Sequence, residues 1–178
     1  MTNTITNPVL ETIKNRRSTR AFTDQPVTRA ELDAILSAGC WAPSGHGHQG
    51  WHFSALTTAE HTARMAAAVR TALDLPESYC FYGAPCHIIV SYEATHQHAW
   101  LDGTAAVENM LLAAESLGLA ACWINQIRVC CDDPAVRALL TEYGIPQDHT
   151  VIASIALGHG AAITAPKPRR EGVITIVE

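Results

Sequence analysis

The residues best suited to chemistry lie in a short basic segment near the start of the chain, Arg16-Arg17-Ser18-Thr19-Arg20. Its three guanidinium groups with two hydroxyl groups between them suit a phosphate. Arginine offers paired N–H donors in a geometry that matches an oxyanion, and a serine hydroxyl can add a short hydrogen bond. The segment therefore predicts a binding site for an anionic, phosphorylated ligand.

A second group of cations, Lys167, Arg169 and Arg170, lies near the other end of the chain. With Lys14 and the three arginines near the start, it accounts for seven of the 12 lysines and arginines in a chain of net charge −5. Two interpretations are open: both ends build one anion pocket, or they are two solvated basic patches. Charge alone favours the second.

Several common motifs of nucleotide-binding and hydrolytic proteins are missing. No G-x-x-x-x-G-K-[ST] sequence is present, so no P-loop is expected. The nearest approach to a dinucleotide-binding G-x-G-x-x-G is Gly158-His159-Gly160, which lacks the third glycine and a following helix. There is no G-x-S-x-G sequence, which argues against an α/β-hydrolase.

The histidines and cysteines show no spacing typical of a metal site. His46 and His48 flank a glycine, and His96 and His98 form a second pair. Side chains two apart on an extended chain point to opposite faces, and no H-E-x-x-H or C-x-x-C pattern occurs. We expect no metal site, with a metal- or haem-binding protein as the weaker alternative. The adjacent Cys130-Cys131 could be redox-active.

The composition fits one globular domain over residues 1–178. With 48% hydrophobic and 16% charged residues, there is enough apolar material to offset chain entropy. No apolar run approaches the roughly 18 residues that span a membrane, and the first residues do not resemble a secretory signal. The net charge of −5 argues against nucleic-acid binding. We expect a cytoplasmic protein that binds neither membranes nor nucleic acids.

Capping residues and apolar patterns predict the elements that must position these residues. Asn7-Pro8 begins a short helix that ends at the basic segment, and Thr28 with Glu31 forms the capping box of a second helix. Further along the chain we expect a strand at 51–56, a helix from 57 or 58 to about 75, a strand at 86–92, a helix at 99–117, a strand at 119–124, a helix at 133–144, and strands at 151–157 and 173–177.

This order predicts a sheet with helices on both faces. The helix at 99–117 is apolar nearly all round, which is typical of a core or a subunit interface. We expect its face around Val107, Met110, Leu111 and Ala114 to pack against the same helix of a second subunit. An intrachain core is the alternative.

Five segments carry a resemblance to a known family: residues 16–22, which follow R-x-S-x-R-x-F, residues 42–53, 81–85 and 105–126, and the basic residues 167–170. In this order they resemble the short, compact branch of the nitroreductase-like family of FMN-dependent flavoproteins. That family has an R-x-S-x-R-x-F opening, an A-P-S-x-x-N-x-Q-P-W-x-F loop and a K-x-R sequence near its end. The resemblance covers essentially the whole chain. It implies an α+β fold, an α/β/α sandwich with a central, mostly antiparallel sheet, in a homodimer.

The resemblance also implies that FMN binds at the dimer interface. Its phosphate would be held by residues of both basic ends: Arg16, Ser18, Lys167 and Arg169. Arg17 and Arg20 would lie along the ribityl chain and the pyrimidine side of the ring. On this interpretation the basic ends meet on one phosphate, which reverses the conclusion from charge alone.

Other residues would approach the flavin ring. Pro43, Ser44 and Gly45 would come from the other subunit, and the stretch around Cys122 and Trp123 would pass the reactive edge, offering backbone donors. The loop departs from the family pattern by having Gly47 for Asn and Gly50 for Pro. We expect these glycines to loosen the loop and widen the pocket mouth, with His46 and His48 taking over polar contacts.

The implied activity is FMN-dependent oxidation of NADH or NADPH. Hydride would pass to flavin N5 and then, in a ping-pong sequence, to an electron-poor small molecule such as a nitroaromatic or a quinone. No side chain is expected to be an essential catalytic acid or base, and Arg20 would stabilise the reduced flavin. The alternative is a flavin-binding protein without turnover, used for sensing or storage.

Overall fold

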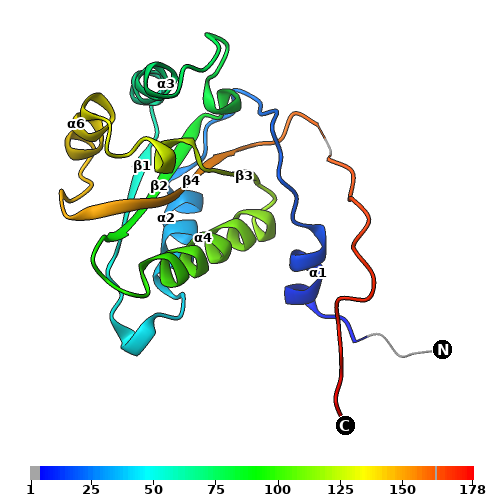
Figure 1. Ribbon diagram of the computed structural model, residues 1–178. Coiled ribbons are helices and arrows are strands. Elements are labelled where there is room, and N and C mark those ends of the chain that lie inside the picture. The colour runs from blue at the N-terminus through cyan, green and yellow to red at the C-terminus, as the bar shows by residue number, and fades with distance from the viewer. Residues whose placement is uncertain (1–4, 163) are drawn as a thin grey trace.

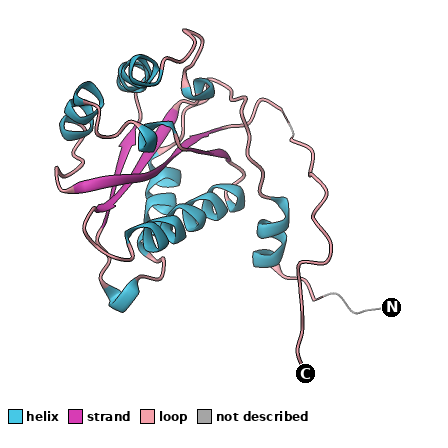
Figure 2. Ribbon diagram, in the orientation of Figure 1, coloured by secondary structure: helices cyan, strands magenta, loops and turns pink. Residues whose placement is uncertain are grey.

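A four-stranded antiparallel sheet in the order β1-β2-β4-β3 forms the centre of the fold (Figures 1 and 2). The computed structural model describes residues 5–162 and 164–178. The strands are β1 (Trp51–Leu56), β2 (Cys86–Glu93), β3 (Ala120–Ile124) and β4 (His149–Gly158). β2 and β4 are central and β1 and β3 lie at the edges, so the two strands of longest apolar sequence are the most buried.

Helices cover both faces of this sheet, as the sequence predicts (Figure 1). One face carries α2 (Arg29–Cys40) and α4 (Ala99–Ser116). The other face carries α3 (Ala59–Leu73), α5 (Gln126–Val129) and α6 (Pro134–Glu142). Outside these layers lie α1 (Pro8–Asn15), which contacts α4, and two single 3-10 turns, η1 (Gly45–Gly47) and η2 (Phe81–Gly83). Among the described residues, no helix is both long and apolar enough to cross a bilayer.

Local capping interactions place the helix ends close to the predicted positions. Asn7 Oδ1 accepts a hydrogen bond from Leu10 N at 3.0 Å, and the capping box of Thr28 and Glu31 is present. Thr58, rather than Thr57, caps α3. These signals work because the cap and the helix it begins are neighbours in the sequence.

The predicted strand at residues 173–177 is wrong. This part of the tail runs past α1 on the outside of the molecule, and its four large apolar side chains are 64–91% exposed (Figure 1). A strand is stable only when a neighbouring strand satisfies its backbone groups, and no strand of the described chain lies beside this segment. The run of β-branched residues is therefore present without the structure that it usually accompanies.

The expectation that α4 packs against a second copy through Val107, Met110, Leu111 and Ala114 is also wrong. All four are at most 3% exposed within the single chain, where they pack in the core between α4, α2 and the sheet. The helix is apolar nearly all round because the sheet covers one side of it and α2 another. The intrachain alternative is correct.

One core residue, His87 on β2, is polar and fully buried. Its ring stacks on Phe81 with 4.2 Å between ring centroids, and neither ring nitrogen has a hydrogen-bond partner among the described residues. Burial lowers the pKa of His87 from 6.5 to about 3. The folded protein therefore keeps His87 neutral at a pH where the unfolded chain protonates it.

We expect acid to destabilise the fold through His87. Below pH 6.5 the unfolded state binds one more proton than the folded state, so the free energy of unfolding falls by about 1.4 kcal/mol per pH unit. Between pH 6.5 and 5 this amounts to roughly 2 kcal/mol. Urea unfolding of His87→Leu at several pH values should show a flatter profile than the wild type. Parallel profiles for wild type and His87→Leu would contradict the prediction.

Candidate functional site

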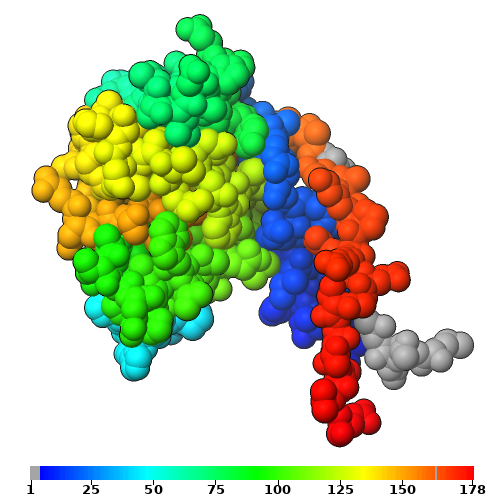
Figure 3. Space-filling model, in the orientation of Figure 1, coloured from blue at the N-terminus to red at the C-terminus, as the bar shows by residue number. Residues whose placement is uncertain are grey.

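The two basic ends of the chain meet in one pocket of about 180 Å³, which we call the basic pocket. Segments 16–20 and 164–169 line it (Figure 3 shows them in blue and orange-red on the same side of the molecule). Six of the predicted site residues are among its lining: Arg16, Arg17, Ser18, Arg20, Lys167 and Arg169. This arrangement agrees with one shared pocket and not with two separate patches.

The basic segment reaches this pocket because it leaves α1 in an extended form and joins the sheet. Ser18 forms a parallel bridge with Ala121 of β3, where Thr19 N donates to Ala121 O at 3.0 Å. Phe22 forms an antiparallel bridge with Gly160, just beyond β4. Alternate side chains of an extended segment point to opposite sides. Ser18 therefore lines the basic pocket, while Thr19 lines the space on the other side.

Arg16 and Arg17 have different surroundings. Arg16 Nε lies 3.8 Å from Glu108 Oε1 on α4, a contact that is long for an ion pair and leaves most donors of the guanidinium free. Arg17 Nη1 donates to Lys14 O at 2.6 Å and to Arg16 O at 2.9 Å. Arg17 thus satisfies carbonyls at the end of α1, and it offers a ligand fewer free donors than Arg16 does.

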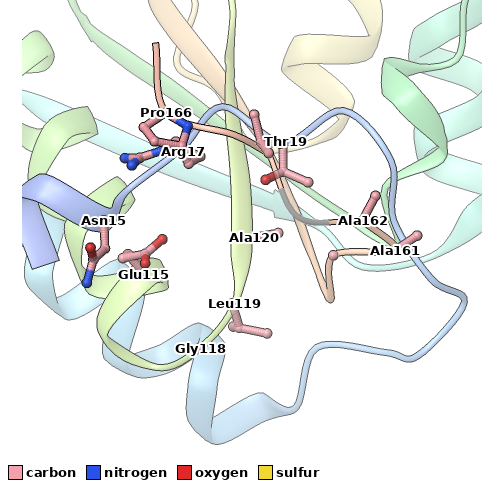
Figure 4. A pocket seen from close by; sticks show the side chains of 12 residues that line it. Asn15, Arg17, Thr19, Glu115, Gly118, Leu119, Ala120, Ala161, Ala162 and Pro166 are labelled. Carbon is pink, nitrogen blue, oxygen red and sulfur yellow. The ribbon is translucent and has the colours of Figure 1, made fainter. Parts of the chain in front are cut away.

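A second pocket of about 480 Å³ adjoins the basic pocket and shares Arg17 and Thr164 with it. Figure 4 shows Arg17 and Glu115 on one side of this space, with Thr19 across from them. Small residues make up much of the remaining wall: Gly118, Ala120, Gly160, Ala161 and Ala162. The cations therefore lie beside room for more of a ligand than a phosphate group.

Cys122 and Trp123 lie on β3 next to the basic segment, although neither lines the basic pocket. Cys122 is buried, and burial raises the pKa of its thiol, while the charges of Arg20 and Arg16 act in the opposite direction. A buried thiol with a raised pKa is a poor nucleophile at neutral pH. Trp123 Nε1 donates to the side chain of Asn125 at 2.9 Å, which fixes the indole ring.

The structure does not bring Pro43, Ser44 and Gly45 to the basic pocket of their own chain. Their loop is seated at the first turn of α4, where Gly45 N donates to Asp102 Oδ2 at 3.0 Å. A Cβ at Gly45 would lie 2.4 Å from His98 Cδ2, so only glycine allows this close approach. The loop is therefore firmly built, but none of the three residues lines the pocket where the basic ends meet.

Asp102 is a residue of this region that sequence reasoning missed. It is only 5% exposed, and the same oxygen that accepts from Gly45 accepts from the Tyr92 hydroxyl at 2.8 Å. The signal in the sequence was weak, a carboxylate in a mostly apolar helix that also carries Glu108 and Glu115. Asp102 ties the loop to α4 and β2.

Four histidines gather around the same loop. The rings of His48 and His96 stack with centroids 4.0 Å apart and planes 3° apart, and His48 Nε2 lies 2.8 Å from Glu93 Oε2. His46 stacks on His98 at 6.1 Å. Parallel stacked rings cannot direct their lone pairs at one ion. In the described ranges, no group of three or more His, Cys, Asp and Glu residues could hold a metal ion. The contacts of these rings brace the loop.

Gly50 does not loosen the loop, contrary to expectation. A Cβ there would lie 2.8 Å from Tyr92 Cε1 and 2.9 Å from His48 Cδ2, and Gly50 O accepts from Glu93 N at 3.1 Å. The missing side chain therefore allows tight packing against β2. Gly47 has a left-handed backbone, with φ of 70°, and open space around it.

Comparison with known proteins places this fold and pocket in context. The Nitroreductase family model matches residues 13–159. A nitroreductase from Bacteroides fragilis, crystallised with bound FMN, is 43% identical and covers 97% of this chain and 100% of its own, with a TM-score of 0.94. Another with bound FMN, from Desulfitobacterium hafniense, is 27% identical over 98% of this chain and 100% of its own, with a TM-score of 0.89. An FMN reductase (NADPH) of Bacillus subtilis is 27% identical, and the match covers 92% of this chain and 70% of that protein. The chain belongs to the nitroreductase family.

Proposed function

We propose that the protein is an FMN-dependent NAD(P)H oxidoreductase that passes hydride to an electron-poor small molecule such as a nitroaromatic or a quinone. The observation that carries the proposal is the basic pocket, in which cations from both ends of the chain converge. The two related nitroreductases named above were crystallised with FMN. When bound, FMN supplies the group that accepts hydride from NADH or NADPH and gives it up to the acceptor.

The donor set of the basic pocket suits a phosphate. We assign the FMN phosphate to four residues: Arg16, Ser18, Lys167 and Arg169. Of the cations lining this pocket, only Arg16 lies within 4.0 Å of a carboxylate of the described chain, so most of the positive charge is uncompensated. A dianionic phosphate would neutralise it, with paired N–H donors from arginine and a hydroxyl from Ser18.

We assign the remaining site residues to the rest of the cofactor. Arg20 lies on the pyrimidine side of the ring, and backbone groups around Cys122 and Trp123 face the reactive edge. Arg17 contributes charge along the ribityl chain, while its donors satisfy α1. We assign no catalytic acid or base.

We further propose a homodimer in which Pro43, Ser44 and Gly45 complete the partner's site. In support, their loop is firmly built, yet none of the three residues lines its own basic pocket. Trp41, just before Pro43, is 83% exposed and borders an open hollow of about 310 Å³ between α1, α2 and α4. The apolar tail is exposed as well. Exposed apolar surface of this kind is typical of an interaction site, and light scattering of the purified protein tests the dimer.

The chain as a whole is proposed to act as one cytoplasmic domain, residues 1–178. All six cysteines carry free thiols, as is usual for proteins of a reducing compartment.

The visible spectrum before and after anaerobic addition of NADH or NADPH tests the proposed function. We expect the absorption of oxidised flavin, bleaching by one of the nucleotides, and release of FMN on heating. A colourless protein that takes up no added FMN would overturn the cofactor assignment. Bound FMN that neither nucleotide bleaches would favour the alternative, a flavin-binding protein without turnover.

A further inference from the structure

Tyr82 is coupled to the basic pocket through Arg20. The Arg20 guanidinium carbon lies 5.8 Å from the centroid of the Tyr82 ring, a cation–π arrangement. Interaction with the Tyr82 side chain is also the largest cause that raises the pKa of Arg20. Arg20 belongs to the basic segment and Tyr82 to η2, and Figure 1 shows these segments, in blue and green, running next to each other.

The turn that presents Tyr82 has an unfavourable backbone. Phe81, Tyr82 and Gly83 have φ values of 51°, 63° and 67°, three left-handed residues in succession. Only glycine adopts this region without cost, and two of the three residues are aromatic. Such strain persists where the surroundings impose it, and it gathers at functional sites.

The burial of Phe81 imposes this left-handed backbone on the turn. Its side chain is 0% exposed, packs on His87 with 4.2 Å between centroids, and meets Tyr79 edge-on at 5.1 Å. Gly83 N closes the turn by donating to Cys80 O at 3.0 Å. Because Phe81 is fixed inward, Tyr82 projects to the surface, where it is 43% exposed. A rigid base thus supports an aromatic surface under Arg20.

Arg20 has little else to hold it. Its Nη1 lies 3.4 Å from Ser18 O, at the long limit of a hydrogen bond, and no carboxylate of the described residues lies within 4.0 Å. An exposed arginine otherwise samples many rotamers. The Tyr82 ring is therefore the main restraint on the direction of this guanidinium.

We propose that Tyr82 is a positioning residue that holds Arg20 at the pyrimidine side of FMN and thereby sets the reduction potential of the flavin. This inference rests on the proposed function and deepens it. Reduction increases the negative charge of the pyrimidine part of a flavin, and a preorganised cation stabilises that charge better than a mobile one. Loss of the ring should shift the equilibrium about fivefold toward oxidised flavin, which is about 20 mV for a two-electron couple.

The test compares Tyr82→Ala with Tyr82→Gly by redox titration of the bound FMN and by thermal unfolding. Both variants lose the ring, so both should lower the potential by about 20 mV while FMN occupancy stays at the wild-type level. Their stabilities should differ, because a φ near 60° suits glycine and strains alanine. If Tyr82 had only a structural role, the reduction potential of the flavin would follow the stability of the two variants. We instead expect both variants to show the same shift in potential although they unfold at different temperatures.

Two further variants make the assignment falsifiable. Tyr143→Ala is the matched control, because Arg64 lies over the Tyr143 ring at the same 5.8 Å, between α3 and α6, and its potential should equal that of the wild type. In an Arg20→Ala background, Tyr82→Ala should cause no additional shift. An additional shift there, or a wild-type potential in both Tyr82 variants, overturns the assignment of Tyr82 while the proposed function stands. Wild-type protein that binds no FMN overturns the proposed function itself.

Discussion

Combined replacement of Arg16 and Arg169 by alanine should give a folded protein that has lost its affinity for FMN. Hydrogen bonds to a charged group contribute about 1.5–3 kcal/mol each, so loss of both arginines should weaken FMN binding about 10²- to 10⁴-fold. Folding should be unaffected, because Arg169 is exposed and the one ion pair of Arg16 is long and at the surface. Fluorescence titration of the apoprotein with FMN measures the affinity, and circular dichroism monitors the fold.

The matched control changes the same charge elsewhere. Arg29 is largely exposed in the first turn of α2, and Arg170 follows Arg169 but does not line the basic pocket. The variant Arg29→Ala with Arg170→Ala should bind FMN within about twofold of the wild type, because neither side chain lines the basic pocket and salt weakens the effect of exposed charges. Full FMN occupancy in the Arg16 and Arg169 variant would contradict the phosphate assignment. Equal losses in both variants would show a general charge effect.

Asp102→Ala should be the most destabilising of the proposed substitutions. The change leaves two donors without an acceptor, the part-buried Gly45 N and the buried Tyr92 hydroxyl, which lie 3.0 and 2.8 Å from the carboxylate. Two hydrogen bonds to a buried charged group correspond to about 3–5 kcal/mol of unfolding free energy. In a chain of 178 residues this lowers the melting temperature by roughly 10 °C, which calorimetry or urea unfolding can measure.

Tyr92→Phe separates the two hydrogen bonds of Asp102. The variant removes the phenolic donor but keeps the bond from Gly45, so we expect it to cost less than half as much as Asp102→Ala. If Tyr92→Phe costs as much as Asp102→Ala, the bond to the loop contributes nothing to stability. The Asp102→Ala variant should also take up FMN less completely, because the loop that is proposed to close the partner's site loses its support.

Interactions between sequence neighbours explain which parts of the fold were predictable. Helix starts at Asn7, Thr28 and Asp133 follow from caps, which need only a few consecutive residues. The strand order β1-β2-β4-β3 depends on contacts between distant segments, and nothing in the apolar runs specifies it. The single turn of α5 is too short to show a helical period. The tail at 173–177 shows the converse, a strand-like pattern without a neighbouring strand to pair with.

The site also has features that the sequence could predict and features that it could not. The cations of the basic pocket could be found from residue type and from the resemblance, because phosphate binding requires particular side chains. The capping of α1 by Arg17 depends on where the helix carbonyls point, and the burial of Asp102 depends on where a loop 57 residues away is seated. The position of Tyr82 depends on a left-handed turn that neither aromatic residue favours. These properties arise only when the chain has folded.

The extended path of residues 16–23 also has a consequence for solubility. β3 is an edge strand, and the bridge between Ser18 and Ala121, with the bond from Thr19 N, occupies part of its open side. Uncovered strand edges recruit strands from other molecules and lead to aggregates. The segment that brings arginines to the pocket therefore also shields the sheet from self-association. Substitutions that detach this segment from β3 should reduce the yield of soluble protein, whether or not they change the affinity for FMN.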